Sequence, residues 1–259
     1  MTTAHHSTED EKRSAVVTGA STGIGEATVR ALAAGGWQVY AVARRAERLE
    51  ALAAQTGAIP VAADIAEDDD VARLLEAVTA GGGADTLINI AGGARGTDWI
   101  AEAKTEDWEW MLRANVIGTM KITRAFLPML RATGRGTVLN LTSVAGLVSY
   151  EGGGGYNAAK FAERGMTRAL RLEEAEHNVR VIEVLPGLVK TEEFTLRRLG
   201  GDADAAEKVY AGVEEPLTAE DVADVVRYAV TVPHHINLDE IVIRPVAQAA
   251  AHKLIRRGA

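Results

Sequence analysis

The sequence predicts an α/β protein with a doubly wound parallel sheet of about seven strands and helices on both faces. Short runs of β-branched residues alternate with stretches rich in Ala, Leu and charged residues. This alternation is typical of repeated strand–helix–strand units, in which helices cover a buried parallel sheet. The connections between parallel strands are expected to be right-handed, which produces the doubly wound arrangement.

Residues 1–12 are polar and are expected to form a tail. No linker, repeat or change of composition interrupts the rest, so residues 13–259 are expected to form one domain. The expected strands are Ala15–Thr18, Gln38–Ala43, Ile59–Ala62, Thr86–Ile90, Thr137–Leu141, Arg180–Leu185 and Glu240–Ile243. The expected helices are Ile24–Ala34, Ala46–Gln55, Asp69–Thr79, Glu106–Ala132, Tyr156–His177 and Ala219–Val230.

Three helix ends have local signals. Gly35 and Gly36 are suited to ending the first helix, because glycine adopts positive φ without a steric penalty. Thr105 is expected to cap the long helix through its hydroxyl. Thr218 and Asp221 have the spacing of a capping box for the last helix.

Composition excludes several classes of protein. The 259 residues carry a net charge of −8, with 28 basic and 36 acidic side chains. This balance argues against general binding to nucleic acid or to anionic membranes. There is no cysteine, so disulfides and thiolate metal sites are excluded, and no pattern of His and acidic residues predicts a metal. Neither an apolar secretory segment nor a membrane span is recognisable, and a cytoplasmic protein is expected.

A glycine-rich turn from Thr18 to Gly25 joins the first expected strand to the first helix. Glycines let the backbone approach a pyrophosphate, and the helix N-terminus offers amides and partial positive charge. The same residues also fit the G-x-S-x-G pattern of a serine hydrolase with Ser21 as nucleophile. That pattern belongs in the middle of a sheet, after several strands, whereas here only a polar tail precedes it.

Arg44 and Arg45 follow the second expected strand, where an acidic residue would hold the ribose 2′-hydroxyl of NAD. Ala43 is neutral, and an arginine can form a forked contact with a phosphate. The pair therefore favours NADP over NAD.

Tyr156 and Lys160 lie four residues apart at the start of an expected helix, hence on one face. A free tyrosine has a pKa near 10 and is a poor base at neutral pH. The nearby ammonium and the helix N-terminus are expected to lower that pKa. The pair is then suited to exchange a proton with an alcohol or carbonyl oxygen.

Together these motifs resemble the short-chain dehydrogenase/reductase family from about Ser14 to Pro245. The resemblance implies a Rossmann-like fold that binds NADP(H), and it implies Ser143, Tyr156, Lys160 and Asn115 as the active-site residues. Tyr156 would exchange the hydroxyl proton, and Ser143 would donate to the substrate oxygen. The cofactor-binding residues that it implies are Gly19, Ser21, Thr22, Gly23, Ile24, Gly25, Arg44, Arg45, Asp64, Ile65, Asn89, Ala91, Gly92, Tyr156, Lys160, Pro186, Gly187, Val189 and Thr191.

One position departs from the family pattern, because Ile90 stands where the second Asn of Asn-Asn-Ala-Gly is usual. The C-terminal part resembles reductases of hydroxy acids and of the clavulanate pathway. Residues 190–215 would form a lid over a small carbonyl or alcohol substrate, and Arg95 is a candidate contact for a substrate carboxylate. The family resemblance implies a homotetramer, with a dimer as the second choice. A non-catalytic dinucleotide-binding regulator on the same fold is the alternative function.

Overall fold

The computed structural model describes residues 13–258, so the tail expected over residues 1–12 lies outside the described residues. Seven parallel strands form one sheet in the order β3-β2-β1-β4-β5-β6-β7, which confirms the predicted fold class. The strands are β1 (Ser14–Thr18), β2 (Gln38–Ala43), β3 (Ile59–Ala62), β4 (Thr86–Asn89), β5 (Thr137–Leu141), β6 (Arg180–Pro186) and β7 (Glu240–Ile243). All seven lie within two residues of the predicted bounds.

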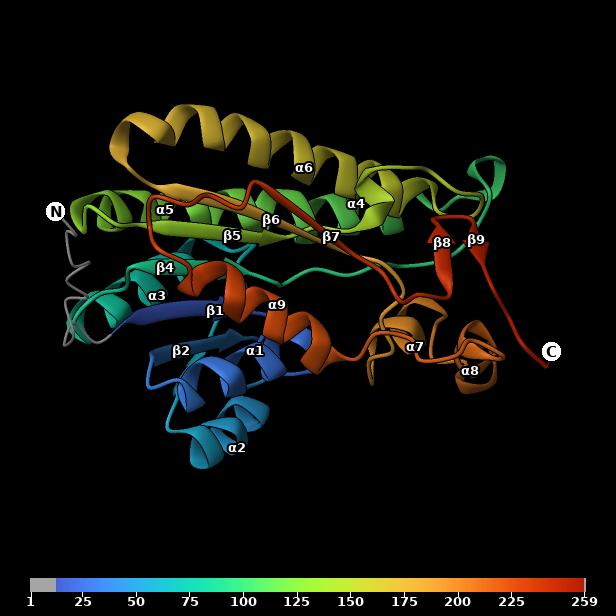
Figure 1. The fold of residues 1–259 in the computed structure, drawn as a ribbon, viewed down its shortest axis with the longest axis horizontal. Coiled ribbons are helices and arrows are strands. Elements are labelled where there is room, and N and C mark those ends of the chain that lie inside the picture. The colour runs from blue at the N-terminus through green and yellow to red at the C-terminus, as the bar shows by residue number, and fades with distance from the viewer. Residues whose placement is uncertain (1–12, 259) are drawn as a thin grey trace, which may run out of the picture.

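Helices cover both faces of the sheet (Figure 1). One face carries α1 (Gly23–Ala34), α2 (Ala46–Thr56) and α9 (Ala219–Thr231), whose apolar residues share one core cluster. The other face carries α3 (Asp68–Ala80), α5 (Gly118–Ala132) and α6 (Gly154–Glu174), which share a second cluster. A further helix, α4 (Thr105–Leu112), packs against α6. The two clusters bury the sheet on both sides, as a parallel sheet requires.

The long helix expected over Glu106–Ala132 is interrupted by a wider π-helical turn, Arg113–Ile117, between α4 and α5. Within this turn the side-chain amide of Asn115 donates to the carbonyl of Met111 at 2.7 Å. A side chain that bonds into the helix ladder is a usual cause of such irregularity. The turn places Asn115 toward the strand ends instead of continuing a regular helix.

The helix-end predictions had different outcomes. The capping box of Thr218 and Asp221 is present. Thr105 does not cap α4, because the cap position falls on Lys104, which makes no side-chain capping bond. After α1 only Gly36 adopts positive φ, at 82°, whereas Gly35 has φ −80°.

The predicted element list omitted two short helices, α7 (Phe194–Arg198) and α8 (Ala203–Tyr210), and a hairpin of β8 (Gln248–Ala250) and β9 (Lys253–Leu254). The helices lie within the segment 190–215, where a lid was expected. Figure 1 shows α7, α8 and the hairpin together at one end of the molecule. Within residues 13–258, no helix combines the length and the apolar character that crossing a membrane requires.

Candidate functional site

A cleft of about 1100 Å³ opens at the carboxyl ends of the strands. Its lining comes from the segments that follow β1 to β6, together with α7 and part of the C-terminal hairpin. In open parallel sheets, ligands bind outside the carboxyl ends of the strands, where the strand order reverses. Here that reversal falls between β1 and β4.

The glycine turn after β1 has room only for glycine at two positions. A Cβ at Gly25 would lie 2.2 Å from the carbonyl oxygen of Gly19. Gly19 has φ +71°, and a Cβ there would lie 2.9 Å from the amide nitrogen of Ala91. The bare backbone of this turn and the start of α1 form a cradle on the cleft wall, the usual seat of a phosphate group.

Two buried hydroxyls beside the turn lack a hydrogen-bond partner within the described part of the chain: Thr22 Oγ1 and Thr191 Oγ1. Both residues line the cleft, and Thr191 packs against the glycine turn, since its Cβ lies 3.4 Å from the position that a Cβ on Gly23 would take. A buried hydroxyl without a partner is costly unless a ligand satisfies it. The residues present therefore fit a dinucleotide whose pyrophosphate accepts from these two hydroxyls.

The two arginines after β2 behave differently. Arg45 donates to Ser21 Oγ at 2.9 and 3.2 Å and to a carboxylate oxygen of Glu193 at 2.7 Å. Arg44 is largely exposed and lies 3.8 Å from Asp64. Both line the cleft and add positive charge at the position where a 2′-phosphate would distinguish NADP from NAD.

Ser21 is not arranged as a hydrolase nucleophile. Its hydroxyl accepts a hydrogen bond from the guanidinium of Arg45. A nucleophilic serine needs a neighbouring base that accepts its proton, and a guanidinium cannot do so. Within residues 13–258, no hydrogen bond joins a histidine to Ser21. The histidine contacts that do occur involve Glu176 and Asn178, far along the chain.

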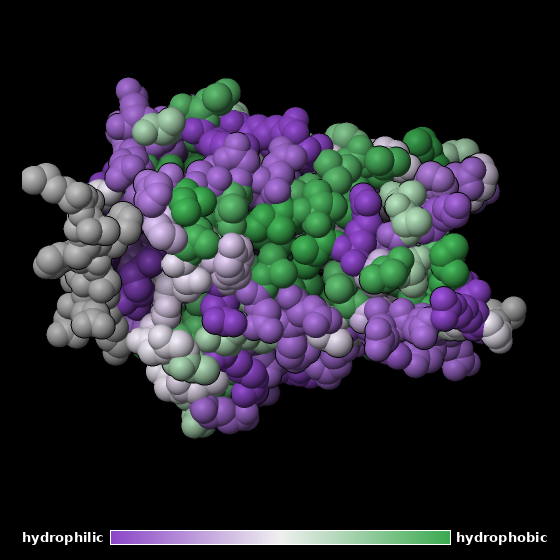
Figure 2. Space-filling view, viewed as in Figure 1, coloured by the Kyte–Doolittle hydropathy of each residue, from purple (hydrophilic) through white to green (hydrophobic). Residues whose placement is uncertain are grey.

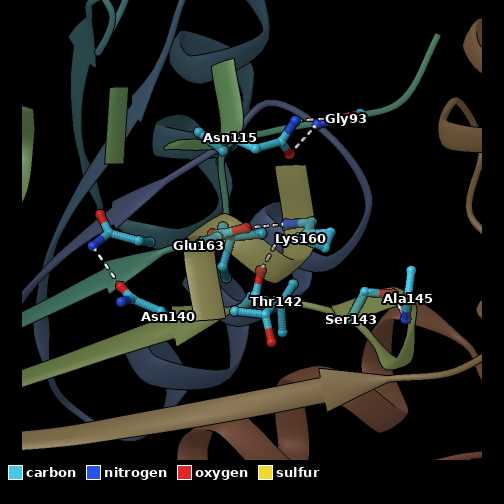
Figure 3. A network of polar contacts seen from close by, with 12 residues as sticks. Gly93, Asn115, Asn140, Thr142, Ser143, Ala145, Lys160 and Glu163 are labelled. Carbon is cyan, nitrogen blue, oxygen red and sulfur yellow. Dashed lines mark hydrogen bonds and ion pairs between the residues drawn. The ribbon is translucent and has the colours of Figure 1, made fainter. Parts of the chain in front are cut away.

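Tyr156, Lys160 and Ser143 come together in the cleft wall. Tyr156 and Lys160 lie on the first turns of α6, and Ser143 follows β5. The ammonium of Lys160 lies 5.9 Å from the centre of the Tyr156 ring. It donates to the carbonyl of Leu141 at 3.2 Å and contacts Glu163 at 2.6 Å (Figure 3).

The expected lowering of the Tyr156 pKa is wrong. Burial raises the pKa of Tyr156, and this effect outweighs the lowering by the Lys160 ammonium and by a hydrogen bond with Ser143. Removing a phenol from water disfavours its charged form. Tyr156 is thus held as a neutral phenol, the form that donates a proton.

Glu163 was not predicted from the sequence, yet it contacts Lys160 directly, and only 1% of it is exposed. Burial lowers the pKa of Lys160, but the charge of Glu163 and its hydrogen bond raise that pKa overall. For Glu163 the effect of burial has the opposite sign: burial raises the pKa of this carboxyl group, and it does so more than Lys160 lowers it. The sequence did hold a signal for this contact, because Glu163 follows Lys160 by three residues and therefore lies on the same face of the helix.

The two predicted asparagines lie behind the cleft lining. The side chain of Asn115 both accepts from the amide of Gly93, at 3.0 Å, and donates to its carbonyl, at 2.9 Å (Figure 3). Asn89 is buried and donates to Thr123 and Asn140. Asn115 thus holds the segment after β4 in place, whereas Asn89 ties the end of β4 to α5 and β5. The other predicted residues line the cleft: Gly19, Ser21, Thr22, Gly23, Ile24, Gly25, Arg44, Arg45, Asp64, Ile65, Ala91, Gly92, Ser143, Tyr156, Lys160, Pro186, Gly187, Val189 and Thr191.

Comparison with known proteins agrees with this geometry. A family described as short chain dehydrogenase matches residues 13–199. The chain is 50% identical to an uncharacterised oxidoreductase of Mycobacterium tuberculosis over 93% of this chain and 94% of the relative. It is 39% identical to a serine 3-dehydrogenase of Agrobacterium fabrum, over 91% and 95%. A solved structure, the closed form of a serine dehydrogenase complexed with NADP+, superposes with TM-score 0.89 at 35% identity, covering 94% of this chain and 99% of that one.

Proposed function

Because this chain belongs to the short-chain dehydrogenase/reductase family, and is thus an NAD(P)-dependent oxidoreductase, we propose that it uses NADP(H) and that Tyr156 exchanges the proton of a carbonyl or secondary alcohol substrate. The observation that carries this proposal is the meeting of a buried phenol and an ammonium beside a phosphate cradle in one cleft. General acid–base catalysis requires such a group within reach of the substrate oxygen.

NADP(H), bound along the cradle, would supply or accept the hydride. In the direction of reduction, Ser143 donates a hydrogen bond to the substrate oxygen, where negative charge develops. Tyr156 gives its proton to the same oxygen. Lys160, one turn along α6, stabilises the phenolate that remains. Glu163 keeps Lys160 charged inside the buried site.

The preference for NADP rests on charge at the end of β2. Arg45 is held by Ser21, and Arg44 lies beside it on the cleft wall. No acidic residue replaces Ala43 at the end of the strand to repel a 2′-phosphate. The relative whose structure contains NADP+ supports the same choice.

Replacing Tyr156 with phenylalanine tests the assigned chemistry. Tyr156→Phe removes the proton donor and keeps the ring, which packs edge-on against Phe194 at 5.8 Å. We expect kcat for NADPH-dependent reduction to fall by about 100-fold or more. NADPH affinity, measured by fluorescence titration, should change less than about threefold, because the phenol is a small part of the nucleotide seat.

Full activity of Tyr156→Phe would contradict the proposal. Ser21→Ala serves as the comparison variant, since a hydrolase would lose all activity and the oxidoreductase would lose little. A wild-type chain that binds NADPH but reduces no member of a panel of aldehydes, ketones and β-keto acids would instead support the non-catalytic regulator.

We further propose that the chain assembles into a homotetramer, with a dimer as the second choice. Large apolar side chains are exposed on α4, the π-helical turn and α6, among them Leu112, Ile117, Phe161 and Leu172. Figure 2 shows another apolar area at the middle of the face that carries β7 and α9. Exposed apolar patches mark association surfaces. Light scattering coupled to gel filtration measures the oligomeric state, and a monomer would contradict this proposal.

A further inference from the structure

Arg198 differs from the other basic side chains that line the cleft, because its hydrogen-bond partners are neutral. Six of the basic side chains that line the cleft lie within 4.0 Å of a carboxylate: Arg44, Arg45, Arg95, Arg113, Lys160 and Arg197. Arg198, at the end of α7, has no carboxylate partner among residues 13–258. Among the cations that line the cleft in these residues, Arg198 is therefore the one without a carboxylate within 4.0 Å.

Arg198 is held in place by neutral acceptors. Its guanidinium donates to the hydroxyl of Tyr150 at 3.0 Å and, at longer range, to the carbonyls of Gly96 and Gly152, both at 3.4 Å. The backbone carbonyl of Arg198 also accepts from the amide of Gly96 at 3.0 Å. Contacts to two separate loops fix the position of a partly buried side chain. A guanidinium so held, without a counter-charge, is suited to bind an anion.

Arg198 also lies beside the reacting group. Its guanidinium carbon lies 5.6 Å from the centre of the Tyr156 ring and 5.5 Å from that of Tyr150. One small substrate can therefore reach both the phenol of Tyr156 and the guanidinium of Arg198. Phe194, packed against Tyr156, adds an apolar wall to this part of the cleft.

We propose that Arg198 is the specificity-determining residue of the site, and that it binds a carboxylate or sulfonate carried by the substrate close to the carbon that exchanges hydride. This inference rests on the proposed function and narrows its substrate class to small anionic carbonyl compounds and their alcohols. The forked guanidinium matches a planar carboxylate in two parallel hydrogen bonds. Serine, named for two similar proteins, carries such a group.

Arg95 does not fill this role, although the sequence suggested it as a carboxylate contact. Its guanidinium stacks over Trp110 at 4.2 Å and lies 3.8 Å from Asp107. The neighbouring carboxylate would repel a substrate anion. Of the cations that line the cleft between residues 13 and 258, Arg198 is the one without such a neighbour.

The experiment compares two NADPH-dependent substrates, acetoacetate and methyl acetoacetate, in which a carboxylate is exchanged for its neutral methyl ester. The wild type should prefer the acid. In Arg198→Ala, kcat/KM for the acid should fall by about 10- to 100-fold, the size of one charge-assisted contact, while that for the ester changes less than about threefold. Arg198→Lys should recover part of the preference, because it keeps the charge and loses the fork.

Arg197→Ala is the matched control, since Arg197 is the adjacent arginine on α7 and has its own partner, Glu193. It should change the acid-to-ester ratio less than about twofold. If Arg198→Ala lowers activity on acid and ester equally, Arg198 only supports the fold and the inference fails. The inference also fails if Arg198→Ala leaves the activity on both the acid and the ester at the wild-type level.

Binding separates this inference from the proposed function. Calorimetry measures 3-hydroxybutanoate binding to the enzyme with NADPH. Loss of that binding in Arg198→Ala, with retention in Arg197→Ala, would support the anion site even if no turnover occurred. Absence of turnover with every substrate would then contradict only the proposed function. Turnover with equal preference for acid and ester would contradict only the anion site.

Discussion

The ammonium of Lys160 lies 2.6 Å from a carboxylate oxygen of Glu163, and at most 6% of either side chain is exposed. A carboxylate this close offsets part of the field that Lys160 exerts on Tyr156. Glu163 also raises the pKa of Tyr156 directly, although less than burial does. The balance between these two buried charges therefore modifies the pH at which Tyr156 can act as a base, in addition to the larger effect of burial.

Alcohol oxidation should become faster as the pH rises, whereas carbonyl reduction should not. Burial raises the pKa of Tyr156 above its usual 10.0, so the phenol is protonated at neutral pH. Reduction uses this protonated form, and oxidation needs the phenolate. Rates measured in both directions between about pH 7 and pH 10 check this. An oxidation rate independent of pH over that range would contradict it.

Glu163→Gln should move the rise of the oxidation rate to lower pH, by less than burial moves it to higher pH. The substitution removes a negative charge that raises the pKa of Tyr156 and leaves Lys160 unopposed. The pH profile of kcat/KM is the measurement. Glu163→Asp keeps the charge and should leave the midpoint in place. A lower rate with an unmoved midpoint would show that Glu163 serves only packing.

Arg45→Ala should raise the KM for NADPH by about tenfold and leave the KM for NADH nearly unchanged, because only NADPH carries the 2′-phosphate. Arg44→Ala should act in the same direction. Arg48→Ala is the comparison variant: Arg48 contacts Glu192 and Glu193 on the same side but does not line the cleft. Equal effects on the two nucleotides would remove the argument for NADP.

Glu193→Gln should raise the ratio of kcat/KM with NADPH to kcat/KM with NADH by about threefold or more. In the wild type, the carboxylate of Glu193 occupies the guanidinium of Arg45. Arg45 and Arg197 both lower the pKa of Glu193, although burial opposes them, so Glu193 is ionised and repels a phosphate at neutral pH. Kinetics with both nucleotides test this. A weaker preference for NADPH in Glu193→Gln would instead mean that Glu193 positions Arg45 for the phosphate.

Gly25→Ala should destabilise the protein by about 1–3 kcal/mol and weaken NADPH binding, since its Cβ would meet the backbone oxygen of Gly19 at 2.2 Å. Gly165→Ala is the matched control in α6, where a Cβ meets nothing within 4 Å. That variant should gain about 0.5–1 kcal/mol, because alanine favours the helix. Thermal unfolding distinguishes the two, and a stable Gly25→Ala would be inconsistent with the tight turn.

The sheet was predictable because each strand is a short apolar run between polar turns, and the glycine turn follows the first of them. The interruption of the long helix at Asn115 was not, since the residues show only a continuous helical pattern, and the side chain of Asn115 bonds both into the helix at Met111 and to Gly93, which is distant in sequence. The small helices α7 and α8 lack the length that gives a clear helical period. Their contribution to the cleft follows from tertiary contacts.

The same distinction holds for the site. Tyr156 and Lys160 are readable because four residues on one helix define their spacing. Which arginine lacks a counter-charge is a property of the folded chain, since Arg95 and Arg198 look equivalent in the sequence. The pKa of Tyr156 was expected in the wrong direction because burial, the largest cause, is invisible before folding.

Glu193 and Arg198 stand at the two ends of one five-residue helix, α7, which starts directly after Glu193. The first contacts Arg45 at the nucleotide end of the cleft, and the second lies beside Tyr156. A mutation that shifts this helix would therefore alter the coenzyme preference and the substrate preference at once. Directed evolution toward a new coenzyme and toward a new substrate would therefore interfere with each other in this enzyme, and libraries should vary residues 193–198 jointly.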